Sequence, residues 1–171
     1  ILDHKVEKND GYKIKGNLNN INLPNKSCDL IFISHTLEHI PHIQIQNVLT
    51  EINRIMKKNS TIRILVPNLY RIARAYVKKD KRFFREAIKE DHSIRKDLGI
   101  GGMFMNFIVS PGQDTMLINR NVNQFIAGYA HLYSYDFKMM KILLSKCGFS
   151  NIKEKKFCNS GIQDFKIPCH I

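Results

Sequence analysis

Two short segments of this chain are continuously apolar, as strands buried in a parallel sheet are. Residues 30–33 are four large apolar residues in a row, which predicts a strand buried on both faces. Residues 61–66 form a second such run. Between them, apolar positions recur with helical spacing, and Pro41 suits the first turn of a helix that extends to about Lys58. Strand, helix and strand with short connections predict a right-handed βαβ unit with parallel strands.

Local signals set the expected ends of the elements. Lys57 and Lys58 suit the C-terminus of the first helix, and Asn59 suits a left-handed residue after it. Ser134 can cap a helix over 135–146 that Gly148 ends. That helix is expected to bury Phe137, Met140, Ile142, Leu143 and Leu144. Further helices are expected at 69–77 and 83–88, with a strand at 151–157.

Residues 90–130 have no clear periodicity. They are too long for a plain connection, so we expect an insert over 80–130 that acts as a lid or acceptor-binding segment. We interpret Gly99 to Gly102 as a helix stop and hinge, because no strand precedes them as in a ligand-binding glycine loop. The sheet core is then expected in 1–79 and 131–171.

Composition narrows the class of protein. The 171 residues fit a single domain with a real core, and no apolar run could span a membrane. The net charge of +12 comes from lysines spread along the chain, so we interpret it as solvated surface and expect no nucleic-acid partner. The four cysteines lack metal-binding spacing, which is typical of a reduced, cytoplasmic protein. The oligomeric state is left open.

A polar cluster follows the first buried strand. Ser34, His35, Glu38 and His39 lie just past its carboxyl end, where open α/β sheets bind ligands. Residues 35–39 also match H-x-x-E-H, a zinc-peptidase motif. That motif needs both histidines on one helix face, whereas here a strand precedes His35 directly. We therefore expect no metal site, and a zinc hydrolase is the less favoured alternative.

The order of these motifs resembles the class I, Rossmann-like S-adenosylmethionine-dependent methyltransferases of the type 11 small-molecule group. The segments that carry the resemblance are 16–18, 23–24, 27–40, 51–57, 62–69, 131–136 and 147–152. The resemblance implies an α/β fold with a mostly parallel sheet and flanking helices. The family's first strand and glycine-rich loop would precede Asp3. We therefore expect a single partial methyltransferase domain, truncated at both ends, that binds its cofactor weakly or not at all by itself.

The resemblance also implies the binding roles of individual residues. Asp3 matches the acid that binds the ribose hydroxyls of S-adenosylmethionine. Asn17 stands where the family commonly has an acid that contacts adenine, and Leu18 offers a backbone N–H and an apolar face. Ser34 and His35 would line the methionine part of the cofactor.

Catalytic and substrate roles rest on fewer signals. His35 is the candidate general base, with His39 as a weaker candidate. His131 and Tyr133 are candidates for binding a small-molecule or sugar-type methyl acceptor. Because a fold does not dictate function, a catalytically inactive binding module with the methyltransferase fold is the principal alternative. Asn17 in place of an acid gives that alternative its support.

Overall fold

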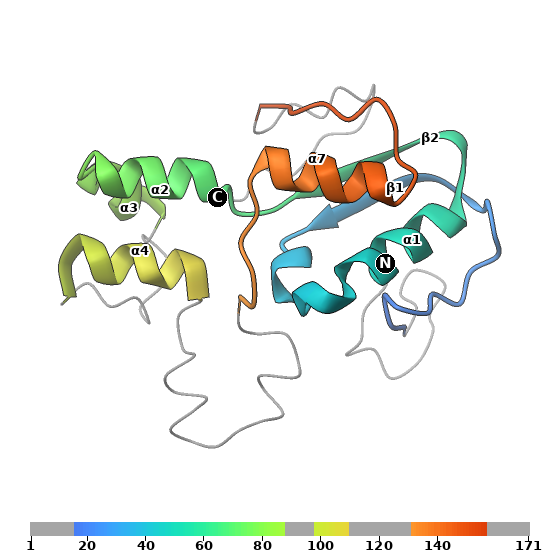
Figure 1. Cartoon of the computed structure of the whole chain (residues 1–171), viewed down its shortest axis with the longest axis horizontal. Helices are drawn as coiled ribbons and strands as arrows, with labels where there is room; N and C mark the ends of the chain where they lie inside the picture. Colours follow the sequence, from blue (N-terminus) through green and yellow to red (C-terminus); the bar gives the residue numbers. More distant parts are fainter. Residues whose placement is uncertain (1–15, 88–97, 110–130, 157–171) are drawn as a thin grey trace, which may run out of the picture.

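A computed structural model describes residues 16–87, 98–109 and 131–156 of the chain. Within these ranges it has two strands, two short 3₁₀ turns and five α-helices (Figure 1). Asp3, much of the expected insert and the expected outer ends of the domain lie outside the described residues. In chain order, the elements are β1 (Cys28–Ser34), η1 (Leu37–His39), η2 (His42–Gln44), α1 (Ile45–Ile55), β2 (Met56–Leu65), α2 (Leu69–Val77), α3 (Lys81–Ala87), α4 (Gly99–Val109) and α7 (Phe137–Lys146).

The two strands form the parallel pair that the sequence predicts. Residues 30–34 of β1 lie in register with 61–65 of β2, and a bulge separates this ladder from the pairing of Cys28 with Met56. The strand β2 therefore begins earlier than expected, and Lys57 and Lys58 belong to it rather than to the end of a helix. Asn59 has the predicted left-handed backbone, with φ of 63°, within the bulged segment.

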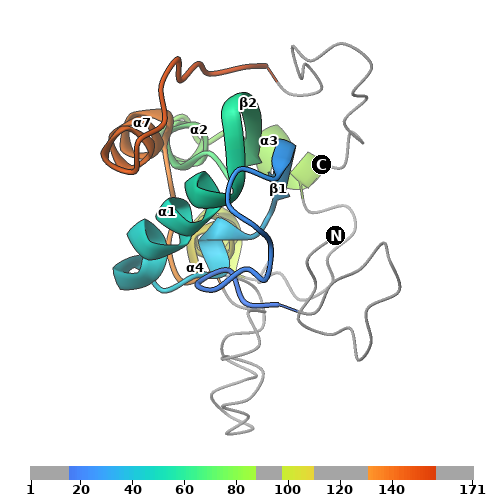
Figure 2. The same cartoon turned by 90° about the vertical axis from the view of Figure 1, so that its right-hand side faces the viewer.

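The helix α1 packs one apolar stripe against the sheet. It begins at Ile45, four residues after the expected start, because the chain after Pro41 first forms the 3₁₀ turn η2. Its buried residues repeat every three or four positions, as an amphipathic helix requires. They are Ile45, Val48, Leu49, Ile52 and Ile55. The helices α1 and α7 lie on the same side of the sheet (Figure 2) and share one hydrophobic core with Ile33 of β1.

Three sequence predictions for α7 and the segment after it are wrong. Its cap is Asp136, whose side chain accepts a hydrogen bond of 2.8 Å from the Met139 backbone N–H, so Ser134 does not cap it. Ile142 is 49% exposed instead of buried. Gly148 ends the helix with a φ of 87°, as predicted. Residues 151–156 then run as irregular backbone, so the described part of the expected strand at 151–157 does not form.

The helices α2, α3 and α4 form a second core beyond the carboxyl ends of the strands (Figure 1). Phe84 and Ile72 are buried at its centre, and Phe107 of α4 packs against Phe84 with 5.8 Å between ring centroids. The segment Gly99 to Gly102 is the first turn of α4, with Gly99 at φ of 64°. These glycines therefore begin a helix, and the predicted helix stop is wrong.

An ion pair on α1 holds the long loop that precedes β1. Arg54 pairs with Glu51 at 2.7 Å and donates to the Leu23 carbonyl at 2.9 Å, and Glu51 accepts from the Ile21 backbone N–H at 2.8 Å. The hydrogen bond from Arg54 and the one from Ile21 lower the pKa of Glu51 to about 2. These bonds fix residues 21–25 against the C-terminal half of α1.

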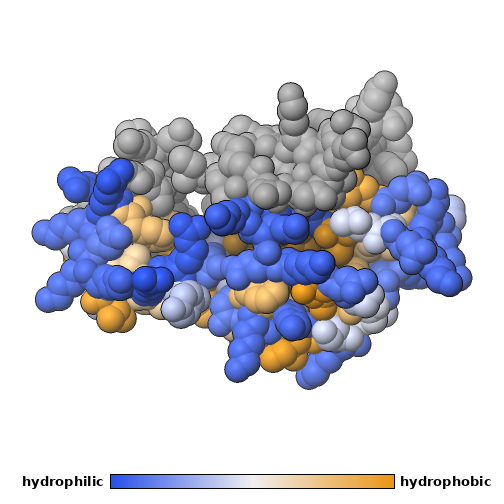
Figure 3. Space-filling view, turned by 90° about the horizontal axis from the view of Figure 1, so that it is seen from above, coloured by the Kyte–Doolittle hydropathy of each residue, from blue (hydrophilic) through white to orange (hydrophobic). Residues whose placement is uncertain are grey.

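Hydrophilic residues dominate the part of the surface that Figure 3 shows. In this view from above the molecule, hydrophobic residues of the described part lie between the hydrophilic ones (Figure 3). Among the described residues, no helix is both long and apolar enough to cross a membrane.

Candidate functional site

The end of β1 sets the position of the candidate site. The backbone N–H of His35 donates to the Leu65 carbonyl at 3.0 Å, which is the last bond between the strands. The backbone of His35 then takes a left-handed conformation, with φ of 46°, which strains a residue other than glycine. This turn leaves Ser34 exposed and the His35 side chain half exposed at the carboxyl edge of the sheet.

Glu38 is the most unusual residue of this edge. The turn η1 directs it inward, and only 1% of its surface is exposed. Its Oε1 lies 3.2 Å from Nδ1 of His35. Apart from that contact, neither carboxylate oxygen has a hydrogen-bond partner among the described residues. The interaction with Glu38 raises the pKa of His35 above 6.5, although partial burial opposes it.

A segment far along the chain completes the site. The backbone N–H groups of Leu132 and Tyr133 donate to the Glu38 carbonyl at 2.7 and 3.2 Å. These bonds place His131 against His39, with 4.9 Å between ring centroids in an edge-to-face arrangement. Ligand atoms of Glu38, His39 and His131 all lie within 4.8 Å of one another.

His131 is oriented by the end of α4. Its Nδ1 lies 3.2 Å from the Phe107 carbonyl, and a carbonyl only accepts, so Nδ1 donates. Burial lowers the pKa of His131 below 6.5, and the bond to Phe107 opposes this only in part. Ser134 also donates to α4, at the Ile108 carbonyl. The expected insert therefore touches the site through the carboxyl end of α4.

Two tyrosines lie beside this cluster. Tyr133 stacks on His42 with 4.0 Å between ring centroids and an interplanar angle of 16°. Tyr135 is fully buried, its hydroxyl has no hydrogen-bond partner among the described residues, and burial raises its pKa to about 12. Tyr133 thus contacts the segment between β1 and α1.

The predicted adenine-binding loop lies at the same edge. Asn17 forms a tight turn in which its Oδ1 accepts from the Asn19 backbone N–H at 2.9 Å. The side chain of Asn19 in turn bonds Gln44 of η2 at 3.1 Å, which fixes this turn beside the start of α1. Asn17 is exposed, while Leu18 packs partly buried against the main core.

The structure therefore brings most of the predicted residues to one edge. His35, His39 and His131 surround Glu38, Tyr133 lies next to them, and the Asn17 turn adjoins η2. From the sequence, Glu38 was expected only as a member of the polar cluster after the strand, and its burial was not predicted. Its sequence neighbours Leu37 and Ile40 are apolar, but the segment that closes over η1, residues 131–133, is remote in sequence.

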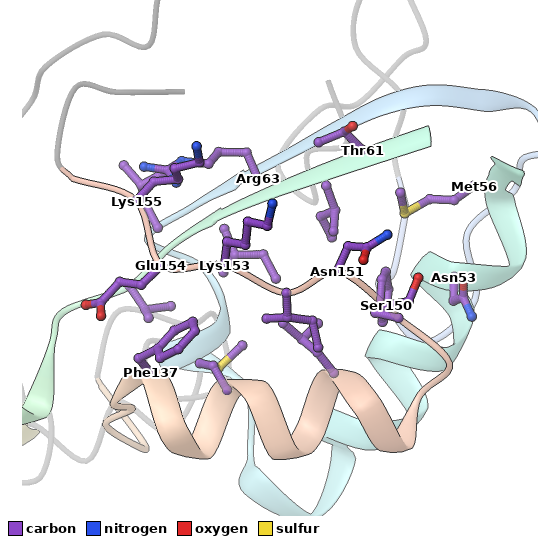
Figure 4. Close-up of a pocket in the computed structure, with 18 of the residues that line it drawn as sticks. Asn53, Met56, Thr61, Arg63, Phe137, Ser150, Asn151, Lys153, Glu154 and Lys155 are labelled. Atoms are coloured by element: carbon purple, nitrogen blue, oxygen red, sulfur yellow. The ribbon is translucent and has the colours of Figure 1, made fainter. Parts of the chain in front are cut away.

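A large cavity lies apart from the polar cluster at the end of β1. It has a volume of about 1130 Å³ and lies between β2, α7 and the segment after α7 (Figure 4). Arg63 of β2 lines it, and burial lowers the pKa of its guanidinium. None of the residues predicted to bind cofactor or acceptor lines this cavity, so it is not the candidate site.

Comparison with known proteins places the βαβ half of the fold in a class. Residues 3–64 match the family model of a methyltransferase domain, and this match supports a class I, S-adenosylmethionine-dependent methyltransferase domain of type 11. The matched span includes the Asn17 turn, β1, η1 and α1 and ends within β2. Methyl transfer is the general activity of the domains that this family model describes. No curated protein and no solved structure matches the chain.

Proposed function

We propose that this protein transfers a methyl group from S-adenosylmethionine to a small-molecule or glycan acceptor, at the carboxyl edge of a Rossmann-like sheet. One observation carries the proposal. The segment that matches the methyltransferase domain contains the parallel strand β1, and a cluster of polar side chains follows it directly. Ligands of open α/β sheets bind at this edge.

The chemistry of the described residues fits the cofactor. Asn17 is exposed and its Oδ1 retains a second lone pair for the adenine amino group. Leu18 offers a half-buried apolar surface on the same turn. Ser34 and His35 present polar groups to solvent at the strand end, for the methionine part. When bound, S-adenosylmethionine supplies an electrophilic methyl group.

The geometry of His35 suits proton removal from the acceptor. A neutral His35 that donates from Nδ1 to Glu38 keeps its Nε2 lone pair as a proton acceptor, at a side chain that is 50% exposed. The buried carboxylate stabilises the imidazolium that forms when Nε2 takes the proton. His39 is more buried and packs on His131, so it is the weaker candidate for a base.

The acceptor is expected to bind between the strand edge and the helices of the second core. Tyr133 stacks on His42 at the strand edge, and His131 contacts the end of α4. This arrangement supports a role for the insert in acceptor binding. The alternative of a zinc peptidase would need both histidines on one helix, and no described α-helix contains both His35 and His39.

Calorimetry on the intact protein tests the proposal. Titration with S-adenosylmethionine and with S-adenosylhomocysteine should show one site, and Asn17→Ala should weaken both without a change in thermal stability. Transfer of a labelled methyl group to a panel of hydroxyl- and amine-bearing acceptors then separates an enzyme from a binding module. Cofactor binding without transfer would support the inactive module, and no binding of either compound would refute the proposal.

A further inference from the structure

We propose that Glu38, His39 and His131 form a binding site for a divalent first-row transition metal ion, of which zinc is the simplest case. Their ligand atoms lie within 4.8 Å of one another, although Glu38 and His131 are far apart in sequence. Two imidazoles and one carboxylate are a donor set that such ions prefer, and magnesium and calcium prefer oxygen alone.

The burial of Glu38 points to a cation. Its carboxylate is 1% exposed, and apart from His35 Nδ1 its oxygens have no hydrogen-bond donor among the described residues. Burying a charge without such partners costs several kcal/mol, on the order of the effective penalty for a single ion in a protein. His35 compensates for part of this through its 3.2 Å contact with Oε1. A metal ion on the inner side would supply the remaining compensation.

The orientation of His131 points the same way. Its Nδ1 donates to the Phe107 carbonyl at 3.2 Å, so a neutral ring carries its lone pair on Nε2. Histidine ligands of metals are commonly held in this manner, with the second ring nitrogen bonded to a carbonyl that fixes the tautomer. The hydrogen bond from Nδ1 to Phe107 therefore leaves the Nε2 lone pair of His131 available to bind a metal ion.

This site differs from the H-x-x-E-H peptidase motif and from the expectation of no metal. That motif would use His35 and His39 with Glu38 as the base. In the structure, His35 contacts Glu38 from the exposed side, and His131 takes the place of the second histidine. The third ligand comes from a segment 92 residues beyond His39 (131 − 39), which no local motif could indicate.

Three protein ligands leave coordination positions open. These positions would take water or another oxygen ligand, such as a hydroxyl group. The identity of that oxygen ligand rests on the proposed methyl transfer. For a methyltransferase, a hydroxyl of the acceptor is the natural ligand, because a bound metal favours its deprotonated form. Metal binding itself does not depend on that activity.

Titration of the metal-free, full-length protein with Co²⁺, followed by its visible absorption, tests the site. We expect one ion per chain. Mutating a residue that only hydrogen-bonds to a metal ligand typically weakens metal binding by about 10- to 100-fold. His131→Ala removes a ligand itself, so it should weaken binding by about 100-fold or more. His42→Ala is the matched control, because His42 is exposed and lies outside the ligand cluster. It should bind within about twofold of the wild type. Absence of binding, or equal binding by His131→Ala, would overturn the proposal.

X-ray absorption on the zinc-loaded wild-type protein needs no variant and remains decisive if a variant fails to fold. We expect two imidazole nitrogens and oxygen at about 2.0–2.2 Å. A sulfur shell near about 2.3 Å would instead show binding by the cysteines and would overturn the assignment. Calorimetry with S-adenosylhomocysteine on the same sample separates the two ideas, because metal binding without cofactor binding refutes only the methyl-transfer proposal.

Discussion

Asn53 of α1 holds the end of α7 at Gly148. The Asn53 side-chain amide donates a hydrogen bond of 2.8 Å to the Cys147 carbonyl, and its Nδ2 lies 2.7 Å from the position that a Cβ on Gly148 would occupy. Gly148 also has a φ of 87°. Two independent constraints, one conformational and one steric, therefore require glycine where the two helices of the main core meet.

The first prediction concerns this contact. Gly148→Ala should destabilise the protein by about 1–3 kcal/mol, because it adds left-handed strain and displaces the amide of Asn53 from its hydrogen bond. Urea unfolding measures the change. Gly101→Ala is the matched control, since Gly101 lies within α4 and a Cβ there meets nothing within 4 Å. That variant should be neutral or slightly more stable, and an equal loss in both variants would contradict the prediction.

The second prediction concerns Glu51 and pH. Its pKa falls from 4.5 to about 2 in the folded protein. A lowered pKa gives stability that is complete above the unfolded value and is lost as the pH falls through the folded value. The difference in free energy of unfolding between wild type and Glu51→Gln should therefore be constant at pH 6–7 and shrink as the pH falls from about 4.5 toward 2.

Asp29 supplies the control for that pH series. It pairs with Lys57 at 2.6 Å, but its side chain is 78% exposed. An exposed pair of this kind contributes between about 0 and 1 kcal/mol, so Asp29→Asn should change the unfolding midpoint little at any pH. A pH-independent effect of Glu51→Gln would show that the carboxylate does not stabilise the loop over residues 21–25.

The third prediction concerns the buried hydroxyl of Tyr135. It has no hydrogen-bond partner among the described residues, so its removal relieves a desolvation cost and breaks no bond. Tyr135→Phe should be as stable as the wild type or more stable by up to about 1 kcal/mol. Tyr135→Ala, at the same site, should lose about 3–5 kcal/mol by opening a cavity. A large loss in Tyr135→Phe would reveal a partner for the hydroxyl.

The fourth prediction concerns His35 as the base. His35→Asn should lower turnover by about 10²- to 10⁴-fold while affinity for S-adenosylhomocysteine changes little. Asparagine is chosen because it tolerates the left-handed backbone that His35 adopts. Lys57→Ala, at the start of β2 and so at the opposite end of the strand from the site, is the control for general effects. Unchanged turnover in His35→Asn would show that transfer proceeds by alignment alone.

The helices, strands and turns whose formation depends mainly on residues adjacent in sequence could be predicted. The strand around residues 30–33, the helix α2 and the glycine at the end of α7 follow from local periodicity and turn chemistry. Predictions failed where two local signals compete. Asp136 caps α7, two positions after the expected cap Ser134. The glycines at 99–102 begin the helix α4, whose apolar residues pack on α2 and α3.

Some features of the candidate site could also be predicted from the sequence, and others depend on tertiary packing. The position of His35 and Glu38 after a buried strand could be read from the sequence, and so could the resemblance that the family match then supported. The burial of Glu38 could not, because it depends on the chain at 131–133, which closes over η1 through backbone hydrogen bonds. The role of a single glutamate thus follows from packing by residues remote in sequence.

By itself, the sequence determined the βαβ unit, its parallel strands and the polar cluster at the strand end, because hydrophobic periodicity and turn residues act over a few positions. Only the tertiary structure decided which side chains meet there. It set His131 against Glu38 and His39 and turned His35 to the outer side. The physical reason is that contacts between distant segments depend on how whole helices pack, and no local pattern of residues encodes that arrangement.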